Sequence, residues 1–176
     1  MRMAKTALFG VMACAAMSAQ LAAHAQSGDT AVATLEGRSG TSTSGTVTFT
    51  QRGTGVMVRA DVTGLPPNSE HGFHVHEKGD CSAPDAMSAG GHFNPAGKPH
   101  GSSAMPEHHA GDMPNLKADA SGHAQATFEL AGMTVAPGPD SIVGRAAVVH
   151  KDPDDYRSQP AGNSGPRVAC GVIAAR

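Results

Sequence analysis

The stretch VMVRADV, residues 56–62, places a small or apolar side chain at every second position. These positions are Val56, Val58, Ala60 and Val62. Successive side chains of an extended chain point to opposite faces, so this set lies on one face. Glycine-containing stretches bound the run on both sides, QRGTG at 51–55 and TGLPPNS at 63–69. The pattern predicts a half-buried β-strand that ends in turns.

The same alternation recurs outward along the chain. TVTFT (46–50) and AQATFEL (124–130) repeat it, and further strands are expected at ATLEG (33–37), AAVVH (146–150) and RVACGVI (167–173). No segment shows helical periodicity, so the sequence predicts an all-β domain built as an antiparallel sandwich or barrel.

Residues 78–121 interrupt the strand pattern with glycine, proline and polar side chains. A loop of this length is uncommon in a compact domain unless it has a function. It contains His92, His100, His108, His109 and Asp112. A bound cation would tie such a loop to itself and offset the entropy lost on ordering it.

The stretch HGFHVHEKGDC, residues 71–81, holds three histidines within six residues. On a strand, His74 and His76 point to one face as neighbouring metal ligands, whereas His71 shares the other face with Phe73 and Val75. We therefore interpret His71 as a hydrogen-bonded or surface residue. A further imidazole, His150, ends a predicted strand just before the acidic KDPDD.

Residues 1–25 have the features of a secretory signal peptide. Arg2 and Lys5 precede an uncharged apolar run, and small residues follow it at Ala23 and Ala25, so we expect cleavage after Ala25. Two alternatives stay open. One is a retained membrane helix, although the run is shorter than the ~20 residues that a span needs. The other is a lipoprotein attached at Cys14, where VMAC loosely resembles a lipobox.

Cleavage leaves residues 26–176, the length of one domain, with Cys81 and Cys170 as the remaining cysteines. An even count in an exported protein suggests one disulfide, which closes a loop of about 89 residues. Of 13 Lys and Arg residues, 11 remain against 15 Asp and Glu. This acidic balance gives no indication of binding to nucleic acid or to an anionic membrane.

Six motifs together resemble the copper/zinc superoxide dismutases, particularly the exported bacterial ones. In chain order they are GFHVHEKGDC, GGHFNP, KPHG, HAGDMPN, VVHKDPDD and GNSGPRVACGVI. They span residues 72–173, and no histidine has to be moved to fit the family's order. The resemblance implies a Greek-key barrel of about eight strands with a long metal-binding loop, a periplasmic location, and a dismutase domain over residues 26–176.

The resemblance also implies one copper and one zinc per subunit. Copper is expected on His74, His76, His92 and His150, and zinc on His92, His100, His109 and Asp112. His92 then bridges the two metals. Four imidazoles suit Cu(II), and three histidines with one carboxylate form a closed set suited to zinc.

Two choices within these motifs rest on the family pattern. The aspartate that connects a copper histidine to a zinc histidine is assigned to Asp154, linking His74 and His100, with Asp152 and Asp155 as alternatives. His109 is preferred to His108 because the family has a histidine, two residues and then the aspartate. His108 is then expected to face solvent.

The implied reaction converts superoxide to oxygen and hydrogen peroxide as copper alternates between Cu(II) and Cu(I), with a nitrogen of His92 delivering one proton. Arg167 matches the arginine at the mouth of the copper channel, and its charge is expected to draw in the anion. The alternative is a surface salt bridge. Lysine-rich steering charge is missing between His150 and Arg167, where only Lys151 and Arg157 are candidates.

The expected partner is superoxide, with no nucleic acid and no stable membrane association, and the protein is a monomer or a homodimer. The expected role is protection of the cell envelope. The alternative function is a non-enzymatic copper or zinc buffer or chaperone. Met87, Met105 and Met113 suit either a soft Cu(I) site or, more simply, loop filling.

Overall fold

The computed structural model describes residues 29–176, so the predicted signal peptide and Cys14 lie outside the described residues. Within residues 29–176 the chain forms nine strands and one short 3-10 helix, η1 (Met87–Ala89). The strands are β1 (Thr30–Gly37), β2 (Ser44–Arg52), β3 (Gly55–Thr63), β4 (Glu70–His71), β5 (Phe73–His76), β6 (Leu116–Lys117), β7 (Ala124–Ala131), β8 (Ala146–His150) and β9 (Arg167–Ala175). The described residues contain no helix long and apolar enough to cross a membrane.

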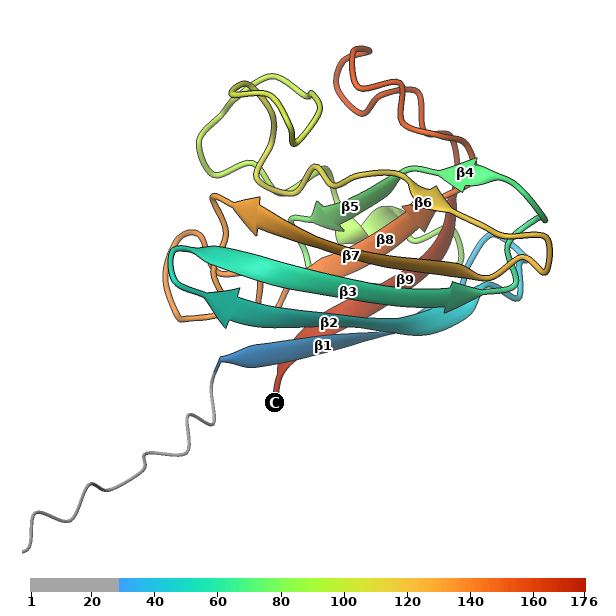
Figure 1. Ribbon diagram of the computed structural model, residues 1–176, viewed down its shortest axis with the longest axis horizontal. Helices are drawn as coiled ribbons and strands as arrows, with labels where there is room; N and C mark the ends of the chain where they lie inside the picture. Colours follow the sequence, from blue (N-terminus) through green and yellow to red (C-terminus); the bar gives the residue numbers. More distant parts are fainter. Residues whose placement is uncertain (1–28) are drawn as a thin grey trace, which may run out of the picture.

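Seven of the strands form one curled antiparallel sheet in the order β5-β8-β9-β1-β2-β3-β7. The chain passes from β3 to β5, at the far edge of this sheet, and later from β7 to β8, so two connections cross the barrel in Greek-key fashion (Figure 1). The predicted all-β barrel is confirmed, and each strand expected from alternation is present. The two-residue strands β4 and β6, which pair with each other, were not predicted.

Strand register turns the alternation into a core. Val58 of β3 lies opposite Phe49 of β2 and Phe128 of β7, and all three belong to the main hydrophobic cluster or pack against it. The next residue, Arg59, pairs with Thr48 and Thr127 on the outer face. A one-residue slip would exchange these rows and expose the apolar side chains, so burial fixes the register.

The long loop covers the free edge of β5. The backbone N–H of Val75 donates to the carbonyl of Gly111 at 2.9 Å, and the N–H of Phe93 donates to the carbonyl of Val75 at 2.8 Å. Bridge pairs place His74 opposite Asp112 and His76 opposite His92. The loop thus satisfies an otherwise open strand edge, and this pairing brings its metal-binding candidates beside those of β5.

The predicted disulfide is present. Cys81 in the loop bonds to Cys170 of β9, with the two Cα atoms 5.7 Å apart. Beneath it lies a second, small apolar cluster of Ala86, Ala89, Ala146, Val148 and Cys170. The bridge therefore pins the start of the loop to the side of the barrel that carries β8 and β9.

We expect the variant with Cys81→Ser and Cys170→Ser to lose about 2–5 kcal/mol of unfolding free energy, because the bridge restricts the conformations open to the unfolded chain and so lowers its entropy. Urea unfolding of the metal-free protein measures this loss. The wild type in the presence of reductant should match the double variant. Equal urea midpoints for the oxidised wild type and the double variant would contradict the expectation.

Candidate metal centre

Four buried imidazoles converge beside β5. His74 and His76 come from that strand, His150 ends the neighbouring β8, and His92 comes from the long loop. One ring nitrogen from each lies within 4.8 Å of the others. Phe73 and Val75, on the opposite face of β5, are in the hydrophobic core, as the period-two reading predicted. We refer to these imidazoles as the four-histidine group.

Backbone carbonyls settle which nitrogens face inward. Nδ1 of His76 lies 2.9 Å from the carbonyl oxygen of Gly90, and Nδ1 of His150 lies 3.1 Å from that of Gly165. A carbonyl can only accept, so each Nδ1 carries the proton of its neutral ring and each Nε2 presents a lone pair. These two Nε2 atoms face each other at 3.2 Å, an arrangement that a cation between them would stabilise.

The other two members lack partners on their inward sides. Nε2 of His74 pairs with Oδ2 of Asp154 at 2.8 Å, which leaves Nδ1 of His74 for the centre. Among the described residues, Nδ1 of His74 and Nε2 of His92 are the buried side-chain polar atoms without a hydrogen-bond partner. Buried polar atoms without partners are uncommon in folded proteins, and all four inward nitrogens here suit a bound metal ion.

A second cluster, which we call the histidine–aspartate group, contains His92, His100, His109 and Asp112. Oδ1 of Asp112 lies 2.8 Å from Nδ1 of His92, 3.0 Å from Nδ1 of His100 and 3.4 Å from Nδ1 of His109. Its other oxygen accepts the backbone N–H groups of Gly101 and His109. One anionic oxygen thus stands among three imidazole nitrogens, a donor set that fits zinc.

His92 belongs to both groups through different ring nitrogens. Its Nδ1 faces Asp112, whereas its Nε2 faces the four-histidine group. Its ring stacks on that of His74 with centroids 3.9 Å apart. A single imidazole therefore connects the two clusters, as the family resemblance implied.

Asp154 joins the two groups from behind. Its Oδ2 lies 2.8 Å from Nε2 of His74 and its Oδ1 lies 2.9 Å from Nε2 of His100. Of the alternatives, Asp155 caps its own exposed turn by accepting the N–H groups of Arg157 and Ser158. The geometry therefore supports Asp154 as the connecting carboxylate.

Burial and charge separate the ionisation of the two groups. Burial, reinforced by neighbouring imidazoles, lowers the pKa of His76 and His150 well below the ordinary histidine value. Burial also lowers the pKa of His92 to about 4. It opposes charge on His100 too, but hydrogen bonds with Asp112 and Asp154 outweigh it and raise the pKa of His100 to about 9. The four-histidine group is thus biased towards neutral rings, the form that binds metals.

Arg167 begins β9, in register opposite His150. Its two terminal nitrogens donate to the carbonyls of Ala86 and Gly90, at 2.6 and 2.5 Å. It makes no ion pair with any residue in 29–176, so the structure does not support the salt-bridge interpretation. Since Gly90 also accepts from His76, the half-buried guanidinium is anchored next to the four-histidine group.

Sequence reasoning missed two amide side chains. The side chain of Asn115 makes two hydrogen bonds with the backbone of Asp154, donating to its carbonyl and accepting from its N–H, both at 3.0 Å. The side chain of Gln159 makes the same pair of hydrogen bonds with the backbone of His100, both at 2.9 Å. The position of Asn115 at the end of HAGDMPN was the available signal, but an amide's partner cannot be read from its neighbours in sequence.

One glycine is required beside Asp154. Gly162 has a φ of +64°, and a Cβ at this position would lie 1.8 Å from Oδ1 of Asp154. A side chain here would displace the carboxylate that connects His74 and His100.

The remaining candidates lie outside the centre. His71 is buried, and its Nδ1 donates to the carbonyl of His150 at 2.8 Å, so it is a hydrogen-bonded core residue. His108 is half-buried, and its Nδ1 donates to the carbonyl of His109. Met113 is in the core, whereas Met87 and Met105 are each 61% exposed.

We expect His109→Ala to lose high-affinity zinc binding and His108→Ala to retain it. His109 directs a ring nitrogen at Asp112, whereas the Nδ1 of His108 donates to the carbonyl of His109, and a closed zinc site needs all four donors. Competition against a chromophoric chelator measures both affinities. Zinc loss in the His108 variant with retention in the His109 variant would reverse the assignment.

Comparison with known proteins agrees with this geometry. The family model described as copper/zinc superoxide dismutase (SODC) matches residues 43–173. Superoxide dismutase [Cu-Zn] 2 of Aquifex aeolicus (strain VF5) is 46% identical over 123 residues, covering 68% of this chain and 72% of the relative. Superoxide dismutase [Cu-Zn] 1 of the same organism is 44% identical over 127 residues, covering 70% and 75%.

Comparison with solved structures finds a protein with the same fold over most of the chain. A crystal structure described as that of the clock protein EA4 superposes with a TM-score of 0.76 at 39% identity. The match covers 85% of this chain and 96% of that chain.

Proposed function

The chain belongs to the copper/zinc superoxide dismutase family, and from this premise we propose an assignment of its metal sites. The enzyme converts superoxide to oxygen and hydrogen peroxide with copper and zinc as cofactors. Copper is held by the four-histidine group, His74, His76, His92 and His150. Zinc is held by the histidine–aspartate group, His92, His100, His109 and Asp112.

One observation carries the assignment, the convergence of imidazole nitrogens that have no protein partner. Nδ1 of His74 and Nε2 of His92 are buried and have no hydrogen-bond partner within residues 29–176, and Nε2 of His76 faces Nε2 of His150. Without a cation, this arrangement would leave buried lone pairs unsatisfied and two of them opposed. A copper ion bound here supplies one-electron redox chemistry.

The protein groups around the site have separate tasks. Arg167 supplies a fixed positive charge that attracts and orients the small anion. His92 would contribute to holding both metals, and its Nε2, which has no hydrogen-bond partner among residues 29–176, is the nitrogen that could take up and release a proton when it is not a ligand. Asp154 holds the rings of His74 and His100 in their ligating tautomers, because its two oxygens accept from their outer nitrogens.

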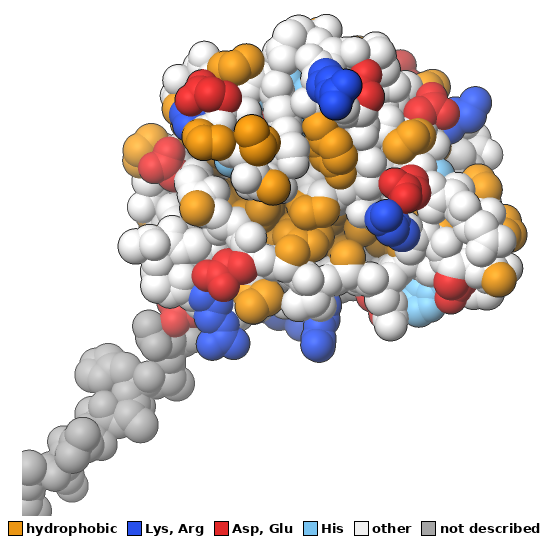
Figure 2. Space-filling view, turned by 45° about the horizontal axis from the view of Figure 1, so that its top comes forward, with side chains coloured by type: hydrophobic (Ala, Val, Ile, Leu, Met, Phe, Trp, Pro, Cys, Tyr) orange, Lys and Arg blue, Asp and Glu red, His pale blue; other side chains and the backbone are white. Residues whose placement is uncertain are grey.

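Long-range steering contributes little in this proposal. Figure 2 shows acidic and basic side chains interspersed over the face turned to the viewer, rather than one broad basic field. Asp85 precedes Ala86, whose carbonyl accepts from Arg167. Its carboxylate also opposes the lowering of the pKa of Arg167 by burial. A negative charge therefore acts electrostatically on the guanidinium that is to attract superoxide, although the two side chains form no ion pair.

We expect Asp85→Asn to raise kcat/KM for superoxide by roughly 2-fold at low ionic strength, with the gain shrinking as salt screens the charge. Asparagine keeps the oxygen that accepts the N–H of Met87, so the local turn is preserved. Pulse radiolysis at several salt concentrations measures the effect. Glu129→Gln, on the outer face of β7, is the matched control. A rate unchanged by Asp85→Asn at all salt concentrations would exclude this steering effect.

We also propose that the protein is exported to the periplasm after cleavage at Ala25 and protects the cell envelope from superoxide. The disulfide between Cys81 and Cys170 supports an oxidising compartment. Intact-mass measurement of the exported protein tests the cleavage. A chain beginning at Gln26 is expected, and one beginning at an acylated Cys14 would replace this proposal with the lipoprotein.

The test of the metal assignment is reconstitution of the mature protein with one equivalent each of copper and zinc, followed by assays of dismutation and of the Cu(II) electron paramagnetic resonance spectrum. We expect activity together with a spectrum typical of four nitrogen donors. Stoichiometric binding with fewer nitrogen donors would contradict the assigned ligands. A four-nitrogen spectrum without activity would favour the metal-buffer function.

A further inference from the structure

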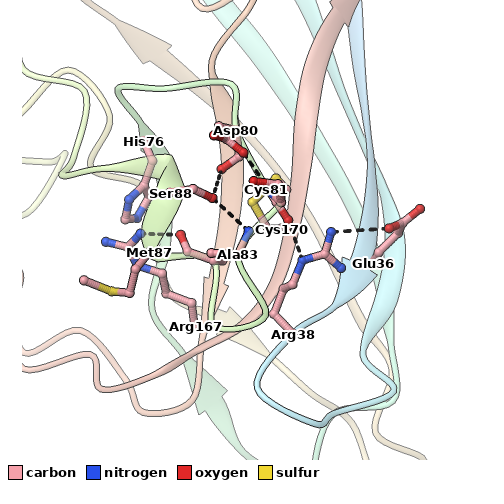
Figure 3. Close-up of a disulfide and its surroundings, with 12 residues drawn as sticks. Glu36, Arg38, His76, Asp80, Cys81, Ala83, Met87, Ser88, Arg167 and Cys170 are labelled. Carbon is pink, nitrogen blue, oxygen red and sulfur yellow. Dashed lines mark hydrogen bonds and ion pairs between the residues drawn. A yellow bond between two sulfur atoms is a disulfide. The ribbon is translucent and has the colours of Figure 1, made fainter.

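The turn between β1 and β2 contacts Arg167, and it also contacts the segment of the long loop to which the guanidinium of Arg167 donates hydrogen bonds. We call residues 38–41 the turn, and residues 80–90, which follow β5 and carry Cys81 and η1, the disulfide subloop. The guanidinium of Arg167 binds the subloop at two carbonyls, those of Ala86 and Gly90. Figure 3 shows Arg38 and Arg167 reaching this segment from different sides of the disulfide.

Two residues of the turn hold the same subloop at other carbonyls. Nε of Arg38 donates to the carbonyl of Cys81 at 2.9 Å, and the backbone N–H of Ser39 donates to that of Pro84 at 2.8 Å. The side chain of Arg38 is only 18% exposed, although it arises from a surface turn. Its other polar contacts are with the carbonyl of Gly37 and with the exposed Glu36. Most of its stem is thus packed where it reaches the subloop.

The turn also holds the backbone of β9 where Arg167 begins it. The hydroxyl of Ser39 donates to the carbonyl of Arg167 at 2.8 Å, and the N–H of Arg38 donates to the carbonyl of Val168 at 2.8 Å. Ser39 has a φ of +53°, an uncommon conformation for a residue with a side chain. In this conformation the backbone N–H and the hydroxyl of one residue contact the subloop and Arg167 respectively.

From these contacts we propose that Arg38 and Ser39 are positioning residues for Arg167. They form a non-covalent connection between β9 and the disulfide subloop, in parallel with the bond from Cys81 to Cys170. The connection fixes the distance between the backbone of Arg167 and the two carbonyls that its guanidinium binds. The proposal rests on the proposed role of Arg167 in attracting the anionic substrate.

The two connections have different dependence on redox conditions. Reduction breaks the covalent link, whereas the hydrogen bonds of the turn do not involve sulfur. With the disulfide intact, loss of Arg38 leaves the subloop anchored at Cys81. In the protein with Cys81→Ser and Cys170→Ser, hydrogen bonds through the turn and through Arg167 itself still link the subloop to β9. Loss of Arg38 then removes one of these links without the disulfide to compensate, so its effect is larger.

The experiment measures azide affinity for the copper- and zinc-loaded protein by titrating the visible charge-transfer absorption. Azide is a small anion that ligates Cu(II), and the proposed copper site lies next to Arg167. We expect Arg38→Ala and Ser39→Ala each to weaken azide binding about 2- to 3-fold with the disulfide intact. In the protein with Cys81→Ser and Cys170→Ser, Arg38→Ala should weaken azide binding about 10-fold. Arg38→Lys keeps the charge but not the Nε donor and should resemble Arg38→Ala. Arg59→Ala, on the outer face of β3, is the matched control and should change nothing.

A double-mutant cycle distinguishes positioning from general loosening. If Arg38 acts through Arg167, Arg38→Ala should have no further effect on azide affinity in the Arg167→Ala background. Hydrogen exchange of metal-free protein should show faster exchange at Ala86, Met87 and Gly90 in the Arg38→Ala variant. Equal effects of Arg38→Ala in both Arg167 backgrounds, or no effect of Arg38→Ala in the protein with Cys81→Ser and Cys170→Ser, would overturn the proposal. If Arg167→Ala itself leaves azide affinity unchanged, the fault lies instead in the proposed role of Arg167.

Discussion

Replacement of His150 by alanine should lower kcat/KM for superoxide by at least about 1,000-fold, well beyond the 10- to 100-fold typical of removing an outer partner of a ligand. His150 supplies one of the two opposed Nε2 atoms of the four-histidine group. It also lies opposite Arg167 in the strand pair. Its loss therefore reduces the copper donors to three imidazoles and opens a space beside the guanidinium.

Both metal content and activity have to be measured for this variant, because an unloaded protein would be inactive for a trivial reason. The protein is to be loaded with one copper and one zinc, and its Cu(II) spectrum should show one nitrogen donor fewer. His123→Ala is the matched control, since His123 is partly exposed and pairs with Asp61 on the outer face. A fully loaded His150→Ala protein with near wild-type activity would refute the copper assignment.

Replacement of Asp154 by alanine should weaken zinc affinity by about 10- to 100-fold. The carboxylate orients His100 through Oδ1 and His74 through Oδ2. Without it, His100 loses the partner that directs its Nδ1 towards Asp112, and the outer nitrogen of His74 is left buried without an acceptor. The copper spectrum should therefore change together with zinc affinity.

Chelator competition measures the zinc affinity, and the Cu(II) spectrum of the zinc-loaded protein reports on His74. Asp155→Ala is the matched control, because Asp155 accepts hydrogen bonds only from its own turn and the nearby Asn163. Wild-type zinc affinity in the Asp154→Ala protein, or an equal loss in the Asp155→Ala protein, would show that Asp154 does not act as the connecting carboxylate.

The strands were predictable because burial imposes a period of two on residues that face the core. This reasoning placed β2, β3 and β7 and assigned Phe73 and Val75 to the face opposite His74 and His76. It failed at β4 and β6, since two residues are too few to show a period. His108, which was expected to face solvent, is partly exposed, and its ring donates to the neighbouring carbonyl of His109.

The candidate ligands were predictable from the family motifs, but their connections were not. Asp152, Asp154 and Asp155 have equivalent chemistry in sequence, and only the folded loop brings Asp154 between two imidazoles. Asn115 makes hydrogen bonds with the backbone of a residue 39 positions away, and Gln159 with that of a residue 59 positions away. A polar side chain gives no indication of which distant backbone group it will meet.

The alternating strands, the composition of the long loop, and the histidines, aspartates and cysteines available for metal and disulfide bonds follow from the order of residues alone. Which strands are neighbours, and which ring nitrogens face each other, depends on how the chain folds in three dimensions. Alternation specifies the face of a side chain but not the partner of a strand. The Greek-key crossings place β5 beside β8, bring His150 to His76, and put the turn at residues 38–41 against the backbone of Arg167.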